Sequence, residues 1–158
     1  MINEFLKSRI EDAKTLVQEL NETYEYVSIL GNYVKTKKAL ITTVSSSIDE
    51  LDNECGFVIK VYKDGHYSEY SCDDIRGLHA ENVIDAITIS TPFATSIPCL
   101  KENTHVESFA REDASSLRDE EIYQRLNAIK EYAHAKNPKV IQVGCVFMKR
   151  ETSKIFVS

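Results

Sequence analysis

The segment His79-Ala80-Glu81, followed later by Pro98-Cys99, has residue types that could build a zinc site. Zinc nucleobase deaminases use an H-x-E segment and a later P-C-x-x-C, in which His and two Cys bind zinc and Glu transfers protons. Here Glu102 occupies the position of the second Cys, so a tetrahedral site would lack one ligand. We therefore favour an ordinary helix surface and keep a small zinc enzyme built on His79 and Glu81 as the least favoured hypothesis.

The other residues that could do chemistry are isolated or typical of a solvated surface. Three further histidines lie far apart in the sequence, and lone histidines are commonly surface residues; they are His66, His105 and His134. A carboxylate cluster lacks the Gly and the ligand spacing of a calcium-binding loop; it comprises Asp49, Glu50, Asp52 and Glu54. No GxGxxG, GxxxxGK[ST], GxSxG or HExxH motif is present. We predict no catalytic, cofactor-binding or metal-binding residue in this chain.

The composition indicates an ordinary folded protein of one domain. Of the 158 residues, 42% are hydrophobic, which is enough to form a core, and 28% are charged, as in ordinary globular proteins. Because 25 acidic residues outnumber 19 basic ones, we expect no direct binding to nucleic acid, which requires many Lys and Arg. No membrane-spanning run and no secretory signal is evident. We expect a cytoplasmic protein with reduced cysteines, namely Cys55, Cys72, Cys99 and Cys145.

A group of tyrosines allows two interpretations. They either line a surface for a peptide or a second subunit, where Tyr is common, or are half-buried residues of a sheet. The group comprises Tyr24, Tyr26, Tyr33, Tyr62, Tyr67 and Tyr70.

Apolar residues spaced three and four apart predict the helices. We expect helices over residues 3–22, from Asp73 or Asp74 to about Ile89, and from Ser116 to Asn137-Pro138, which ends the last one. The first helix has the apolar stripe Leu6, Ile10, Ala13, Val17 and Leu20, and the last has Ile122, Leu126, Ile129 and Ala133.

Alternating and β-branched residues predict the strands. Residues 24–44 suggest two strands with a break near Gly31-Asn32, and Ser45–Ser47 form either a turn or a further strand. Asp64-Gly65 predicts a hairpin that pairs Tyr62 with Tyr67 and Lys60 with Glu69. Residues 139–148 and 154–158 read as two strands joined by a polar turn, with Ile141, Val143, Cys145 and Phe147 on one face.

The order of these elements favours an α+β fold. Strands cluster and do not alternate with helices, so we expect a mostly antiparallel sheet with helices packed on one face, in two layers. We treat residues 1–158 as a single domain, in which residues 91–115 connect residues 1–90 to residues 116–158. Because an apolar strand reaches the last residue, we expect the chain to be a piece of a longer protein.

Two segments resemble the TldD/PmbA family. The block from Cys55 to Ile75 is similar to the family pattern G-x-x-[VI]-[RK]-V-x-x-D-G-x-x-G-x-x-[ST]-x-[ND]-[LI], and residues 137–143 are similar to D-P-R-V-x-Q-V. The chain departs from the family at Lys60 (usually Arg), Ser68 (often Gly) and Asn137 (usually Asp), and the family's Asn-Gly turn is not evident near Ser45–Ser47. The resemblance extends along nearly the whole chain, which corresponds to the N-terminal domain of that family.

The resemblance implies a function for the longer protein and not for this segment. Family members are cytoplasmic, and some were described as modulators of DNA gyrase. The TldD-like member resembles a zinc metallopeptidase with an HExxxH motif, whereas its PmbA/TldE-like partner lacks the motif. That motif lies C-terminal to the matched segment and is absent from this sequence. Zinc is therefore a candidate cofactor of the full-length protein only, and the implied partners are a peptide substrate and a second TldD/PmbA-like subunit, in a homo- or heterodimer.

Overall fold

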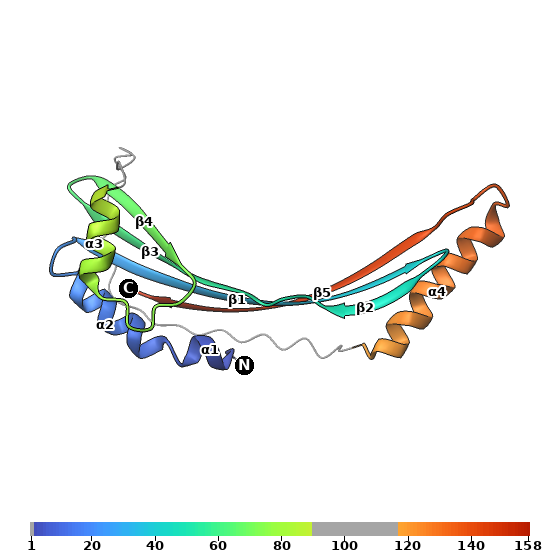
Figure 1. The fold of residues 1–158 in the computed structure, drawn as a ribbon, viewed down its shortest axis with the longest axis horizontal. Helices are drawn as coiled ribbons and strands as arrows, with labels where there is room; N and C mark the ends of the chain where they lie inside the picture. Colours follow the sequence, from blue (N-terminus) through green and yellow to red (C-terminus); the bar gives the residue numbers. More distant parts are fainter. Residues whose placement is uncertain (1, 90–116) are drawn as a thin grey trace. The chain divides into compact units, whose positions relative to one another are not determined.

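The computed structural model describes residues 2–89 and 117–158, which divide into two compact units. Unit 1 contains residues 2–33, 54–89 and 153–158, and unit 2 contains residues 34–53 and 117–152. Two long strands, β1 (Tyr26–Thr42) and β5 (Gly144–Val157), contribute residues to both units. The strand order is β2-β1-β3-β4, and β5 also pairs with β1 (Figure 1). The predicted α+β fold with an antiparallel sheet is confirmed, while the predicted connector at 91–115 falls outside the described residues.

Unit 1 packs three helices against one face of its strands. The helices are α1 (Glu4–Lys7), α2 (Ile10–Leu20) and α3 (Ala80–Ile89), and the principal strands are β1, β3 (Glu54–Lys63) and β4 (His66–Cys72) (Figure 1). Alternate residues of β3 and of the start of β1 enter the core, as strand geometry predicts, although Ser28 on the opposite face of β1 is also buried. The buried strand residues of this core are Val27, Ile29, Phe57, Ile59, Val61 and Ile155.

The predicted first helix is interrupted after its first turn. Residues Ser8 and Arg9 separate α1 from α2, although the apolar stripe persists, with Leu6, Ala13 and Val17 buried. Arg9 is only 4% exposed and donates two hydrogen bonds to Asp74, from Nε at 2.6 Å and from Nη2 at 3.0 Å. We attribute the interruption to this long-range ion pair, which periodicity along the chain cannot reveal.

The predicted start of the middle helix at Asp73 or Asp74 is wrong. Asp74 accepts hydrogen bonds from Arg9 and from the backbone N–H of Arg76, and therefore holds a loop. The helix α3 begins at Ala80, where the Asn82 side chain accepts a hydrogen bond from the backbone N–H of His79 at 3.2 Å. Tertiary contact has replaced the local capping role that the sequence suggested.

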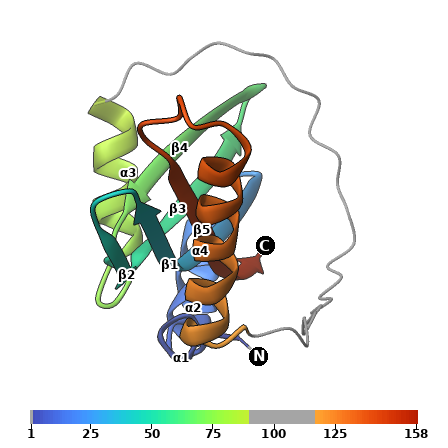
Figure 2. The same cartoon turned by 90° about the vertical axis from the view of Figure 1, so that its right-hand side faces the viewer.

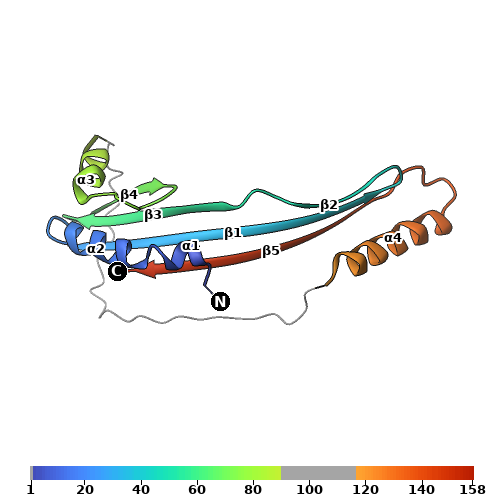
Figure 3. The same cartoon turned by 60° about the horizontal axis from the view of Figure 1, so that its bottom comes forward.

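The predicted break in the first strand pair is also wrong. Strand β1 continues through Gly31 and Asn32 without interruption, and it runs beside β3 and β5 (Figure 3). This position of the strand requires glycine, because a Cβ at Gly31 would lie 2.7 Å from the Phe57 ring and 2.8 Å from Ile155. The glycine marks a close approach of side chains to the backbone and not a turn.

The predicted hairpin is confirmed in its register. Strands β3 and β4 pair Tyr62 with Tyr67 and Lys60 with Glu69, and the last two form an ion pair at 2.7 Å. Asp64 and Gly65 have φ values of 51° and 79°, as a type I′ turn requires.

Unit 2 packs one helix on three strand segments. The helix α4 (Asp119–Lys136) covers parts of β1, β2 (Ser46–Glu50) and β5. Strand β2 pairs antiparallel with β1, with Ala39 opposite Ile48, so the chain turns at residues 43–45 and then continues as a strand. The buried core comprises Ala39, Ile41, Ile122, Leu126 and Cys145.

The start and the apolar stripe of α4 differ from expectation. The backbone N–H of Arg118 donates to Glu121 at 2.9 Å at the helix start, while Ser116, the predicted cap, lies outside the described residues. Ile122 and Leu126 are buried as predicted, but Ile129 is 56% exposed. The packed cluster therefore covers only the first half of the predicted stripe.

The predicted turn at residues 149–153 is wrong, because β5 is one strand of 14 residues. Its polar centre contains no Gly, Pro or Asn to reverse the chain. Lys149 and Glu151 lie two residues apart and form an ion pair at 2.5 Å. Charged side chains of this kind are common on exposed strands, where they oppose association with other chains.

One polar connection in unit 2 leads to a stability prediction. The Thr43 N–H donates to the Val143 carbonyl at 3.1 Å, and the Val143 N–H donates to Thr43 Oγ1 at 2.9 Å. Thr43→Val removes the acceptor, and we expect it to lower the free energy of unfolding by about 1 kcal/mol. Thr43→Ser keeps the hydroxyl, so its loss of unfolding free energy, measured by urea unfolding, should be less than half of the loss in Thr43→Val. Equal losses in both variants would contradict this role for the hydroxyl.

Candidate functional site

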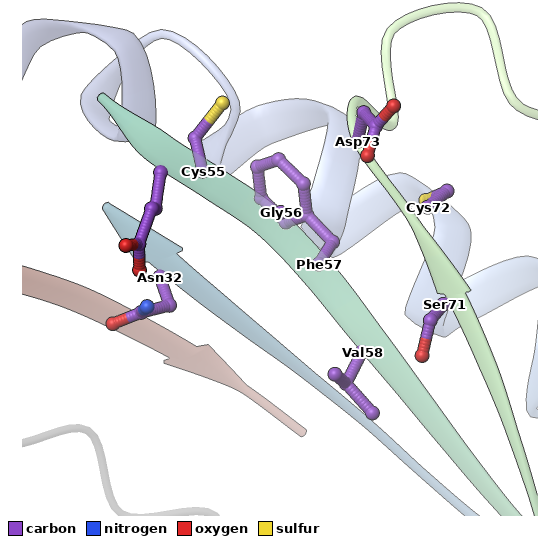
Figure 4. A pocket seen from close by; sticks show the side chains of 9 residues that line it. Asn32, Cys55, Gly56, Phe57, Val58, Ser71, Cys72 and Asp73 are labelled. Carbon is purple, nitrogen blue, oxygen red and sulfur yellow. The ribbon is translucent and has the colours of Figure 1, made fainter. Parts of the chain in front are cut away.

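A hollow of about 370 Å³ lies over the strands of unit 1 (Figure 4). We call it the unit 1 hollow. Its lining comes from three neighbouring strands and the residue after β4, and comprises Asn32, Glu54, Cys55, Gly56, Phe57, Val58, Ser71, Cys72 and Asp73. A concave site that brings several strands together is a natural place for a ligand.

Strand alternation explains how this hollow arises. Phe57 points into the helix-covered core, so its neighbours Gly56 and Val58 face the other side of the sheet. Val58 lies opposite Ser71 in the hairpin register. Gly56 has no side chain to fill the space, and a Cβ there would approach the Cys72 carbonyl oxygen to 3.3 Å. The hollow thus follows from a glycine at an outward-facing position of β3.

The polar groups of the lining are mainly hydrogen-bond acceptors. They include the carboxylate of Asp73 and the hydroxyl of Ser71. The amide oxygen of Asn32 is buried and accepts no hydrogen bond within the described residues. A buried acceptor without a donor lowers the stability of the fold by about 1–3 kcal/mol. A ligand N–H that donated to this oxygen would recover some of that free energy. The arrangement suits a ligand that offers N–H groups.

One of the two thiols of the lining, Cys72, is poorly suited to nucleophilic chemistry. Burial raises the pKa of the Cys72 thiol, and the negative charges of Asp73 and Asp74 raise this pKa further. At neutral pH Cys72 is therefore a protonated thiol, whereas the thiolate is the nucleophile. Cys55 is exposed and free. Cys72 therefore supplies no activated nucleophile to the hollow.

The thiol environment gives a direct chemical prediction. We expect an aromatic disulfide reagent to modify Cys55 at least tenfold faster than Cys72 at pH 7.5, because Cys72 is half-buried and its pKa is raised. Single variants Cys55→Ser and Cys72→Ser would assign the two rates. The rate at Cys72 should still be rising at pH 9, above the ordinary thiol pKa of about 8.5. A plateau below that pH would contradict the raised pKa.

The residues considered for a zinc site are not assembled in the described structure. His79 lies exposed before α3, and Glu81 is exposed in its first turn. Cys99 and Glu102 fall outside the described residues, so their position relative to His79 stays untested. Within residues 2–89 and 117–158, no group of three or more His, Cys, Asp or Glu side chains is placed to hold a metal ion.

The remaining histidines occupy separate places. His66 is exposed at the start of β4, and His105 falls outside the described residues. His134 lies in α4, where its Nδ1 is 3.2 Å from the Val140 carbonyl oxygen and its Nε2 is 3.4 Å from Thr43 Oγ1. Its geometry therefore indicates a structural role in unit 2.

The acidic cluster and the tyrosines also have defined environments. Glu50 forms an ion pair with Lys35 at 3.1 Å, and Asp49 is opposite Lys38 in the strand register. All six tyrosines of the group are partly buried, and all except Tyr24, which precedes β1, lie in strands, which fits the interpretation as sheet residues. Burial raises the pKa of Tyr24, which packs against the unit 1 core.

Sequence reasoning misses most of the unit 1 hollow. Of its lining, only Glu54 belongs to a cluster that the sequence offers as candidate ligands, and the sequence pattern places Asn32 at a break between strands. Asn32 and Ser71 meet only because β1 and β4 flank β3, a pairing that is not local in sequence. An isolated Gly56 within an alternating strand is the available signal, since such glycines often mark close approach of a ligand or backbone.

Two comparisons with known proteins give no match. No model of a known protein family matches the sequence, and no curated protein matches it significantly. None of the helices among the described residues is long and apolar enough to cross a membrane.

Solved structures, in contrast, match almost the whole chain. A candidate modulator of DNA gyrase from Bacteroides thetaiotaomicron has a TM-score of 0.72 at 16% identity, over 95% of this chain and 36% of its own. A second candidate gyrase modulator, from Thermotoga maritima, has a TM-score of 0.58 at 15% identity, over 98% and 34%. TldE from Thermococcus kodakarensis has a TM-score of 0.57 at 12% identity, over 92% and 36%.

These matches settle the architecture. The chain spans about a third of the length of each matched protein. At 12–16% identity, the likeness establishes the fold alone. The resemblance to the TldD/PmbA family predicted from the sequence is therefore confirmed at the level of structure, and the chain has the fold of a segment of the gyrase-modulator and TldE proteins.

Proposed function

We propose that this chain is the N-terminal domain of a cytoplasmic TldD/PmbA-type zinc metallopeptidase and has no catalytic centre of its own. The observation that carries the proposal is the structural match over 92–98% of the chain to proteins about three times as long. The sequence motifs between Cys55 and Ile75 support the same assignment. In this proposal, zinc and the HExxxH motif belong to the remainder of the full-length protein, where zinc would activate water for peptide hydrolysis.

The role of this domain would be to guide an extended, unfolded peptide and to contribute to the subunit interface. The unit 1 hollow supports the first role, because its acceptor groups match the N–H groups that an extended peptide offers. Strand β4 is at the end of the strand order and leads directly into the hollow. A peptide can add to such a strand through main-chain hydrogen bonds, which makes binding largely independent of peptide sequence.

A second candidate is a PmbA-like binding subunit or adaptor without a peptidase centre. It is favoured by one observation, the match to TldE, the type of subunit that the family resemblance describes as lacking HExxxH. The presence or absence of HExxxH in the full-length sequence discriminates between the two candidates.

The test uses the full-length protein, alone and with its partner subunit, and unfolded β-casein as the substrate. We expect one bound zinc ion, zinc-dependent cleavage, and no cleavage by residues 1–158 alone. A zinc-loaded protein that leaves casein intact in both forms would overturn the peptidase proposal and favour the adaptor.

The guiding role has a separate test in the same assay. Ser71→Trp places a large side chain at an exposed position of the unit 1 hollow, and we expect a tenfold rise in KM with little change in kcat. Ser47→Trp, at an exposed position of β2 outside that lining, is the matched control. An unchanged KM for Ser71→Trp would exclude the hollow from substrate binding.

A further inference from the structure

Two aliphatic side chains project from one end of unit 2. Val44 is 90% exposed in the turn between β1 and β2, and Ile141 is 89% exposed before β5. The paired hydrogen bonds between Thr43 and Val143 hold these two segments together. Figure 2 views the strands β1, β2 and β5 and the helix α4 from this end. We name Val44 and Ile141, with Lys136 and Lys139 from the same end, the turn surface.

The pattern of the strand predicts burial for Ile141, which the described structure does not provide. Ile141 continues the alternating series of Val143, Cys145 and Phe147, all of which contribute to the core of unit 2. The series loses its cover at Ile141, which is 89% exposed, and Val44 in the segment joined to it is 90% exposed. Isolated exposed apolar residues are normal, but two almost fully exposed aliphatic side chains in joined segments, one of them at the end of a core stripe, indicate a surface that is covered by something else.

The charge of the turn surface identifies its partner. Neither of the two segments that form it, residues 38–48 and 132–148, contains an Asp or a Glu, although the chain has 25 acidic residues. The charged residues in these segments are Lys136 and Lys139, which belong to the turn surface, and Lys38, which lies opposite Asp49 in the strand register. A second copy that docked the same surface would bring like charges together, which is unfavourable. Three lysines are also too few for strong binding to nucleic acid or to an anionic membrane.

We propose that the turn surface docks an acidic polypeptide segment that carries aliphatic side chains. The aliphatic groups of the segment cover Val44 and Ile141, and its carboxylates pair with Lys136 and Lys139. The contact is of peptide size, so we expect dissociation constants in the micromolar range. This interaction does not depend on the proposed peptidase role, since none of these residues lines the unit 1 hollow.

The test selects peptides from a random 12-residue library on the immobilised 158-residue chain. Synthetic copies of the enriched peptides are then titrated against the same chain. We expect enriched peptides that combine Asp or Glu with Leu, Ile or Val. Val44→Ser and Ile141→Ser together should weaken their binding at least tenfold, and Lys139→Glu should weaken it further. Both aliphatic positions are almost fully exposed, so these variants should unfold at the same urea concentration as the original chain.

The matched control is Phe156→Ser, which removes an exposed apolar side chain in unit 1 and should leave peptide binding unchanged. Three results would overturn the proposal: no enrichment, enrichment of basic or uncharged peptides, or binding that survives the Val44/Ile141 change. Two further measurements test other occupants of the same surface. If the Val44/Ile141 variant lost binding to phosphatidylserine vesicles as strongly as it lost peptide binding, the surface would be assigned to a membrane. If ultracentrifugation showed a dimer that dissociates in Ile141→Ser, the surface would be assigned to a second copy. Either result would overturn the proposal.

Discussion

Replacing Arg9 with Met is expected to lower the free energy of unfolding of unit 1 by about 2–3 kcal/mol. Arg9 is buried, and its guanidinium binds the Asp74 carboxylate through two hydrogen bonds, lies 5.0 Å from the centre of the Phe5 ring and donates to Ser8 at 2.8 Å. Removing one partner of a buried pair leaves the other without its counter-charge, which costs about 3–5 kcal/mol. Asp74 is 38% exposed, so water reduces that cost here.

Urea unfolding followed by tyrosine fluorescence measures this effect, and hydrogen exchange of the β3 amides assigns it to unit 1. The matched control is Lys14→Met, which removes an exposed ion pair with Glu11 at 2.8 Å and should change stability by less than about 0.5 kcal/mol. If the two variants lost the same stability, the Arg9–Asp74 pair would be an ordinary surface pair and not the fixed connection that we describe.

The same pair predicts a loss of stability in acid. The hydrogen bond from Arg9 lowers the pKa of Asp74, and the backbone N–H groups of Arg76 and Ile75 lower it further, against the opposing effect of burial. Because the folded chain binds this proton less readily than the unfolded chain, the stabilisation is complete above the unfolded pKa of about 3.9 and is lost as pH falls through the lower folded pKa. Asp74→Asn should therefore be less stable than the original chain at pH 7. Below pH 4 its free energy of unfolding should change less with pH than that of the original chain.

The elements that could be predicted from sequence are those whose causes are local. The Asp64-Gly65 turn sets the register of β3 and β4, including the pairs Tyr62–Tyr67 and Lys60–Glu69. The α+β class follows from the order of such elements. In each case the residues that determine the structure lie within a few positions of one another.

The errors at the first helix, at the start of α3 and in β1 share one physical origin, which is contact between residues distant in sequence. Arg9 interrupts a periodic helix because Asp74, 65 residues away, binds its side chain. Asp74 then cannot cap a helix, and α3 begins later. The unit 1 hollow combines β1, β3 and β4, so that no single segment of sequence carries its pattern. The continuity of β1 has the same kind of cause, since Phe57 and Ile155 from other strands occupy the space that a side chain at Gly31 would fill.

Gly31→Ala tests that last interpretation, and we expect it to lower the free energy of unfolding by about 2 kcal/mol. The new Cβ would lie 2.7 and 3.0 Å from two atoms of the Phe57 ring and 2.8 Å from Ile155. Real Cβ atoms do not approach other heavy atoms so closely, so the ring or the strands must shift. Phe57 is among the largest fully buried side chains of the core, and close-packed interiors accommodate such shifts poorly. If Gly31 instead marked a flexible break, alanine would be neutral or stabilising.

The control and a double-mutant cycle separate these explanations. Gly144→Ala adds a methyl group where no atom lies within 4 Å, and it should change stability by less than about 0.5 kcal/mol. Phe57→Leu removes ring atoms next to Gly31 and is destabilising by itself through the cavity that it leaves. The Gly31→Ala/Phe57→Leu pair should lose at least about 1 kcal/mol less than the sum of the single losses, because the methyl group then occupies some of the cavity. Additive losses would show that the two positions do not share space, and the uninterrupted β1 would then need another cause.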